Sequence, residues 1–158
     1  VVAEIPSAET ARDLDVMPLT SDSLGVMCRD GHPLAGRRNL GAERLLEFQW
    51  AMPPDSTKTL RRLNALFVAA NLRPPEVAVE SESMAFLVQI VRHSDMISFT
   101  VSTTVNLPEC QGLQFLRVPA LAARREAGVI TRKGGWLSPA AEAIVAELKK
   151  ICASEPTN

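Results

Sequence analysis

The sequence predicts an α/β fold, and three observations carry this prediction. Segments with the composition and alternation of β-strands alternate with segments whose apolar residues recur at helical spacing. The loops between them are short and are marked by proline, glycine and asparagine. Hydrophobic residues make up 46% of the 158 residues and charged residues 22%, which is enough for a sizeable core. This alternation indicates a mostly parallel sheet, with ligand sites at the carboxyl ends of its strands.

Seven short segments are expected to form strands. They are rich in β-branched and other apolar residues, and most end at proline, glycine or a polar turn. They are Val1–Ile5, Leu24–Arg29, Gln49–Met52, Val77–Val79, Met96–Val101, Leu113–Val118 and Ala127–Arg132. The polar segment between the first two, Ser7–Asp15, is expected to be a loop.

Two helices have clear start signals. Ser56 or Thr57 can cap the first helix, and Ser81 or Ser83 can cap the second, because a hydroxyl oxygen accepts a hydrogen bond from a free N–H of the first turn. Asn71 is a natural end for the first helix. Apolar residues at helical spacing define the buried face of each: Leu60, Leu63, Leu66, Phe67 and Ala70 in the first, and Met84, Leu87, Val88 and Val91 in the second.

Three further helical segments have weaker signals. Asn39 can cap a short helix, and a helical turn is expected near Thr103–Leu107. Ser138 and Pro139 open the last helix, as cap and first-turn residue. The residues expected to point inward are Leu40, Leu45 and Leu46 in the short helix, and Ile144, Val145, Leu148 and Ile151 in the last one.

The composition argues against several classes of protein. With 17 Lys and Arg against 18 Asp and Glu, the net charge is −1, so this chain alone is a poor nucleic-acid binder. No apolar run reaches the roughly 18–20 residues that cross a bilayer, so no membrane partner is expected. The cysteines are odd in number and far apart, and no signal peptide is visible. We therefore expect a cytoplasmic protein with reduced thiols, whose start on Val1 without a methionine looks cut from a longer chain.

Motifs for catalysis, metals and cofactors are weak. His93, Ser94 and Asp95 are adjacent, and adjacent residues do not generally reach the geometry of a catalytic triad. Cys28 and His32 lack a second pair of zinc ligands. We therefore expect no catalytic residue, no metal and no cofactor.

The order of several short motifs resembles the effector-binding domain of LysR-type transcriptional regulators. His32-Pro33-Leu34-Ala35 is similar to the turn that follows the first crossing strand in this family. Further matches are spread along nearly the whole chain: Pro18-Leu19 followed by Leu24–Arg29, Leu40 with Leu45 and Leu46, Pro53–Thr57 before Leu60–Phe67, Pro74-Pro75 with Val79-Glu80-Ser81, Leu87–Asp95, Ile97–Thr100, Thr131–Gly134 and Leu137-Ser138-Pro139. His93-Ser94-Asp95 departs from the small, glycine-containing turn usual in the family.

The resemblance implies a type-two periplasmic-binding-protein-like fold of two α/β subdomains. Aligned in this way, residues 1–21 are a remnant of subdomain I, residues 22–133 form a largely complete subdomain II, and residues 134–158 return to subdomain I as a helix and tail. The resemblance also implies a homodimer, a small effector bound between the subdomains, and DNA binding only through an N-terminal domain that this chain does not contain.

Candidate effector-binding residues gather where helices follow strands. The loop that contains Pro54, Ser56 and Thr57 precedes a helix whose free N–H groups suit a carboxylate or another anion. From the residues alone, plain capping by Ser56 is an alternative interpretation of this loop. Ser81 and Ser83 form a second such helix start, where Glu80 and Glu82 would oppose an anion unless they point away. The strand residues Ser98 and Thr100 could face the same cleft or could be half-buried hydroxyls satisfied by the backbone.

The sequence thus predicts an effector-sensing domain of a LysR-type regulator, not an enzyme, with an organic acid as one candidate effector. A solute-binding protein or a small α/β enzyme of the same fold is the alternative.

Overall fold

The computed structural model describes residues 1–54 and 57–154. Contacts divide the chain into two compact units: Val1–Ser23 with Arg124–Asn158, and Leu24–Ala123. The sequence-based division ends its central part at Lys133, whereas the contacts end it at Ala123. The assignment of the parts to two effector subdomains stays a prediction.

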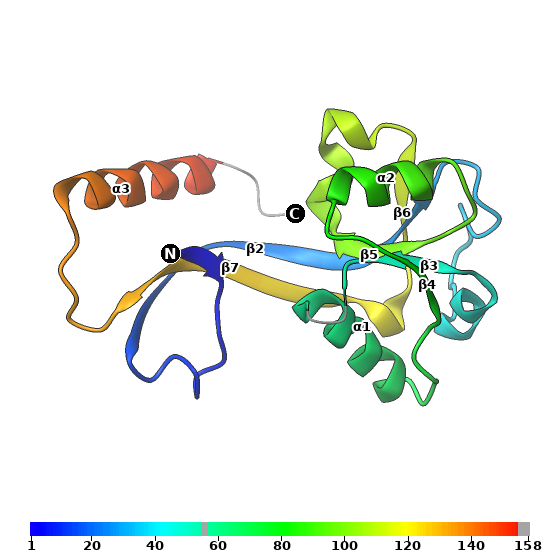
Figure 1. Ribbon diagram of the computed structural model, residues 1–158, viewed down its shortest axis with the longest axis horizontal. Helices are drawn as coiled ribbons and strands as arrows, with labels where there is room; N and C mark the ends of the chain where they lie inside the picture. Colours follow the sequence, from blue (N-terminus) through cyan, green and yellow to red (C-terminus); the bar gives the residue numbers. More distant parts are fainter. Residues whose placement is uncertain (55–56, 155–158) are drawn as a thin grey trace. The chain divides into compact units, whose positions relative to one another are not determined.

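The first unit contains β1 (Val2–Glu4), part of β2 (Leu14–Arg29), most of β7 (Ala123–Arg132) and α3 (Pro139–Ser154). β1 pairs antiparallel with β7, and β7 is hydrogen-bonded to β2 (Figure 1). The residues predict this strand only from Leu24 and a loop up to Asp15, but β2 already begins at Leu14. That expectation is wrong because β2 continues through Pro18 alongside a strand more than a hundred residues away in sequence.

The second unit contains two helices packed on strands. Its strands are the end of β2, β3 (Trp50–Met52), β4 (Val77–Glu80), β5 (Ser98–Val101) and β6 (Leu113–Leu116). Its α-helices are α1 (Lys58–Ala69) and α2 (Met84–Arg92), and short 3₁₀ helices span Ala42–Glu47, Ser102–Asn106, Pro108–Cys110 and Pro119–Leu121. Figure 1 shows α1 and α2 on opposite sides of these strands.

Alternation along β3 explains why helices cover both faces. Trp50 and Met52 pack in a cluster with Leu63 and Phe67 of α1. Ala51, between them, points to the other face and packs with the apolar side of α2. Three of the four α2 residues expected to face the core, Leu87, Val88 and Val91, are buried. The fourth, Met84 in the first turn, is 45% exposed, so that part of the expectation is wrong.

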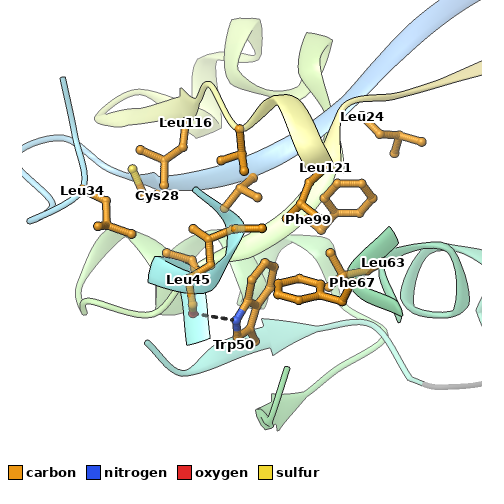
Figure 2. Close-up of a cluster of buried hydrophobic side chains, with 14 of the residues drawn as sticks. Leu24, Cys28, Leu34, Leu45, Trp50, Leu63, Phe67, Phe99, Leu116 and Leu121 are labelled. Carbon is orange, nitrogen blue, oxygen red and sulfur yellow. Dashed lines mark hydrogen bonds between the residues drawn. The ribbon is translucent and has the colours of Figure 1, made fainter. Parts of the chain in front are cut away.

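The largest buried cluster centres on Trp50, which has no exposed surface (Figure 2). Its indole Nε1 donates a hydrogen bond to the Leu45 carbonyl oxygen at 3.3 Å. The Phe67 ring meets the indole edge-on, with ring centroids 5.9 Å apart. Leu34 and Leu116 extend the same cluster. The indole N–H, which would be costly to bury alone, therefore has a partner.

Three local expectations are wrong. The large sheet is not mostly parallel: β1 pairs antiparallel with β7, and β2 pairs antiparallel with both β5 and β6. The parallel pair, β3 with β4, forms a separate two-stranded sheet. Asn39 does not cap the short helix, because its backbone is left-handed (φ 58°) and the helix begins after Gly41. Ile144 and Ile151 of α3 do not point inward but are 61% and 55% exposed.

The remaining elements lie close to their expected positions. The turn predicted near Thr103–Leu107 is confirmed as the 3₁₀ helix Ser102–Asn106. Asn71 follows the end of α1 with a left-handed φ of 58°, as a helix stop requires. Within the described residues, none of the helices has both the length and the hydropathy needed to cross a bilayer.

Candidate ligand-binding site

Three parallel segments of the second unit end at one edge. β3 and β4 pair in parallel, and Trp50 of β3 also forms a parallel bridge with Ile97, the residue before β5. The carboxyl ends of these strands are Met52, Glu80 and Val101, and the first two lead directly towards α1 and α2. The geometry expected from the sequence for a ligand site, carboxyl ends beside helix N-termini, is therefore present in this part of the sheet.

Thr57 caps α1. Its side-chain oxygen accepts a hydrogen bond from the Leu60 N–H at 3.5 Å, and its own N–H donates to the Pro54 carbonyl oxygen at 2.9 Å. Both residues are partly exposed. Ser56, the other candidate in this loop, lies outside the described residues. Of the two caps that the sequence allows, the structure shows Thr57 in this role.

Ser81 and Ser83 share the N-terminus of α2. The Ser83 hydroxyl accepts a hydrogen bond from the Phe86 N–H at 3.3 Å, and the Ser81 hydroxyl accepts one from the Ser83 N–H at 3.1 Å. Each hydroxyl still carries its own hydrogen, which it can donate to a bound acceptor. Ser83 is exposed and Ser81 is half-buried, so these donors lie at the surface end of the strands.

Ser98 and Thr100 lie below this surface. They are 3% and 4% exposed. The Ser98 hydroxyl contacts Met52 Sδ at 3.8 Å, and the Thr100 hydroxyl is 3.3 Å from that of Thr104. Their partners are thus side chains, not the backbone, and neither hydroxyl is at the surface.

Met52 connects the segments of this edge, and the sequence reasoning did not single it out. Its carbonyl oxygen accepts a hydrogen bond from the Ser81 N–H at 3.1 Å. Its sulfur accepts one from the Phe99 N–H at 3.3 Å and also contacts Ser98. The signal that could have identified it is its position as the last strand residue before Pro53.

The buried thiols and the adjacent triad-like residues have structural contacts. Burial raises the pKa of Cys28 to about 11, and burial also raises the pKa of Cys110, so both stay protonated near neutral pH. The Ser94 hydroxyl donates to the Ile90 carbonyl oxygen at 2.6 Å and accepts from the Met96 N–H at 3.1 Å, which closes the end of α2. Among the described residues, no three or more His, Cys, Asp or Glu side chains are grouped so that they could hold a metal ion.

The hydrogen bonds of the His32 ring indicate a neutral imidazole. Its Nδ1 accepts a hydrogen bond from the Leu34 N–H at 3.1 Å, so the ring proton is on Nε2, which donates to the Asp95 carbonyl oxygen at 3.1 Å. The ring also packs on Phe48. Burial lowers the pKa of His32 below its ordinary value of 6.5 and outweighs the opposing hydrogen bond to Asp95.

We expect His32 to make stability fall in weak acid. As the pH drops through about 6.5, the unfolded chain takes up a proton at His32 that the folded chain does not, so the free energy of unfolding decreases. The loss is about 1.4 kcal/mol for each unit by which folding lowers the pKa. Urea unfolding of the parent and of His32→Asn at pH 7.5 and 5.5 checks this. The asparagine oxygen can still accept from the Leu34 N–H, and a decrease as large in the variant as in the parent would contradict the assignment to His32.

Comparison with known proteins shows to which family the chain belongs. The model of the LysR substrate binding domain matches residues 2–153. The chain belongs to this family. Two proteins are similar to this chain in sequence. They are GalR, an HTH-type transcriptional regulator of Pseudomonas putida, and the SDS degradation transcriptional activation protein of a Pseudomonas species. The identity is 28% with GalR over 96% of this chain and 38% of GalR, and 32% with the second protein over 90% of this chain and 47% of that protein.

Solved structures share the LysR-domain fold. The regulatory domain of CcmR from Synechocystis PCC6803, solved in complex with 2-PG, superposes with a TM-score of 0.85 at 22% identity, over 99% of this chain and 74% of that one. The effector-binding domain of QuiR, solved with shikimate, has a TM-score of 0.73 at 19% identity, over 96% of this chain and 71% of that one. The expected α/β, type-two periplasmic-binding-protein-like fold is thereby confirmed. The chain spans less than half the length of the two curated relatives described above.

Proposed function

We propose that this LysR substrate-binding domain senses a small anionic effector and that the effector contacts the edge formed by β3, β4 and β5. The observation that supports this most strongly is the placement of two capped helix N-termini after parallel strands that share one edge. Free N–H groups and the positive end of each helix dipole favour a carboxylate there. Thr57, Ser81 and Ser83 offer hydroxyl donors, and Pro54 shapes the loop before α1.

In this proposal the two buried hydroxyls, of Ser98 and Thr100, support the edge that contacts the effector. Ser98 and Thr100 hold the strand beneath the edge through Met52 and Thr104. Ser56, which lies outside the described residues, remains a candidate contact on the basis of the sequence alone. The CcmR and QuiR domains were solved with 2-PG and shikimate, which makes small hydroxylated acids the first compounds to test.

The effector would act through the rest of a regulator, and the chemistry would be binding without catalysis. We place DNA recognition in the part of an HTH-type regulator that this chain does not match, and we place the protein in the cytoplasm as a homodimer. A ligand that binds one arrangement of such a dimer more tightly raises the population of that arrangement. The DNA affinity of the dimer changes as a result.

Alanine substitutions at the two helix caps test the effector site. We expect a screen of organic acids that includes shikimate to yield a compound that the chain binds, measured by thermal shift and calorimetry. Thr57→Ala and Ser83→Ala should each weaken its binding about tenfold, because each removes a hydrogen bond to a charged group.

Ser138→Ala is the matched control. Ser138 caps α3 in the same way, by accepting from the Ala141 N–H at 3.2 Å, but it lies in the other unit. All three variants should lose about 1 kcal/mol of stability as lost caps, and only the first two should lose affinity. Equal affinity in all three variants and the parent would reject this site, and a screen in which no acid binds would reject an acidic effector.

A further inference from the structure

An arginine-lined cavity lies on the second unit, apart from the residues used above. Arg37, Arg38, Asn39, Arg117 and Pro119 line it, and its volume is about 610 Å³. This volume lies within the range of about 300–1,000 Å³ typical of small-molecule sites. The arginines come from two segments far apart in sequence, the loop after β2 and the connection after β6. The fold therefore brings three guanidinium groups to one concave surface.

Buried neighbours hold the backbone of the first segment. Leu34 and Leu40, on either side of the loop, are 1% and 5% exposed and belong to the main core cluster. Asn39 takes a left-handed backbone (φ 58°), which turns the chain between the arginines and Leu40. Arg37 is further fixed because its Nε donates to the Pro33 carbonyl oxygen at 3.1 Å, which leaves its terminal nitrogens for another acceptor.

The second segment is anchored in the same core. Arg117 stands between Leu116 and Val118, which are both 6% exposed, while the arginine itself is exposed. Leu34 and Leu116 belong to the same buried cluster, and both are labelled in Figure 2. The two segments that carry the arginines are thus joined through packed side chains and do not depend on the arginines for their position.

The cavity has positive charge without a matching carboxylate. None of the described residues that line it is acidic. Two carboxylates of the same unit pair with other arginines: Asp95 pairs with Arg29 at 2.6 Å, and Glu47 pairs with Arg44 at 2.6 Å. Within the described part of the chain, the guanidinium groups of Arg38 and Arg117 have no hydrogen-bond partner. Like charges in one cavity repel, and a bound anion would offset this repulsion.

We propose that this cavity binds a small oxyanion with two or more negative charges. Guanidinium groups present paired N–H donors that match phosphate or carboxylate oxygens, and several such groups favour a multivalent ligand. A nucleic-acid backbone is a poorer fit, because the chain has a net charge of −1 and the arginines line a cavity of limited volume. This inference goes beyond the proposed effector function and does not depend on it.

Calorimetric titration with inorganic pyrophosphate and, separately, with citrate tests the proposal at physiological salt. We expect saturable one-to-one binding of at least one of them. Arg38→Gln and Arg117→Gln should each weaken it about tenfold or more. Binding of pyrophosphate alone would assign the site to phosphoryl groups, and binding of citrate alone would assign it to carboxylates.

Arg73→Gln is the matched control, since Arg73 is exposed on the same unit but does not line the cavity. It should bind like the parent. Arg38→Lys, which keeps the charge but loses the paired donors, should bind more weakly than the parent. The proposal is overturned if neither anion binds saturably, if Arg73→Gln weakens binding as much as the cavity variants, or if a short DNA duplex binds more tightly with the same dependence on Arg38 and Arg117.

Discussion

Gly128→Ala is expected to destabilise the first unit by about 3 kcal/mol, at the upper end of the usual cost of overpacking. A β-carbon at this position would lie 2.3 Å from the Met17 carbonyl oxygen and 3.1 Å from Pro18 Cα. Both are backbone atoms of β2, so the clash cannot be relieved by rotation of a side chain. Gly128 also pairs with Ala3 of β1, which limits its movement in the other direction.

Hydrogen exchange measures the size of the effect and also shows which segments it reaches. In Gly128→Ala we expect faster exchange of the amides of β1 and β7, with little change in Leu60–Phe67 of α1, because the two segments belong to different units. Thr131→Ala, a smaller change of a partly exposed residue in the same strand, serves as control. Exchange that rises equally in both units would show that the chain opens as one cooperative body.

The close approach at Gly128 illustrates what the sequence alone could not show. The starts of α1 and α2 are predictable because a cap and the helical spacing after it are local features, and Thr57 and Ser83 carry both signals. The path of β2 is not local. A proline is unusual inside a paired strand, and only the partner strand β7, which is distant in sequence, shows that pairing continues past Pro18.

The candidate ligand site also contains some residues whose position could be predicted from the sequence and others whose position could not. That Thr57, Ser81 and Ser83 stand at helix starts could be predicted from sequence. The burial of Ser98 and Thr100 could not, because alternation along a strand tells which residues share a face but not which face is covered. Met52 was missed for a related reason: its role depends on contacts with Ser81 and Phe99, which only the pairing of three strands brings to it.

Trp50→Ala is expected to cost about 3–5 kcal/mol, the typical range for removal of a large buried aromatic side chain. Trp50 is wholly buried, packs edge-on against Phe67, and stands two residues before Met52 in β3. The substitution leaves a cavity between β3 and α1 and leaves the Leu45 carbonyl oxygen without its indole partner. Because a typical domain is stable by only about 5–15 kcal/mol, this change removes a large part of the total.

The second tryptophan provides the control for this test. Trp136 is 83% exposed, so Trp136→Ala should change the free energy of unfolding by no more than about 0.5 kcal/mol. Trp50→Phe should fall between the two alanine variants, because it keeps an aromatic ring but loses the hydrogen bond to Leu45. Urea unfolding followed by far-UV circular dichroism compares all three without relying on tryptophan fluorescence. If Trp50→Ala were no more destabilising than Trp136→Ala, the core of the second unit would not be organised around this indole.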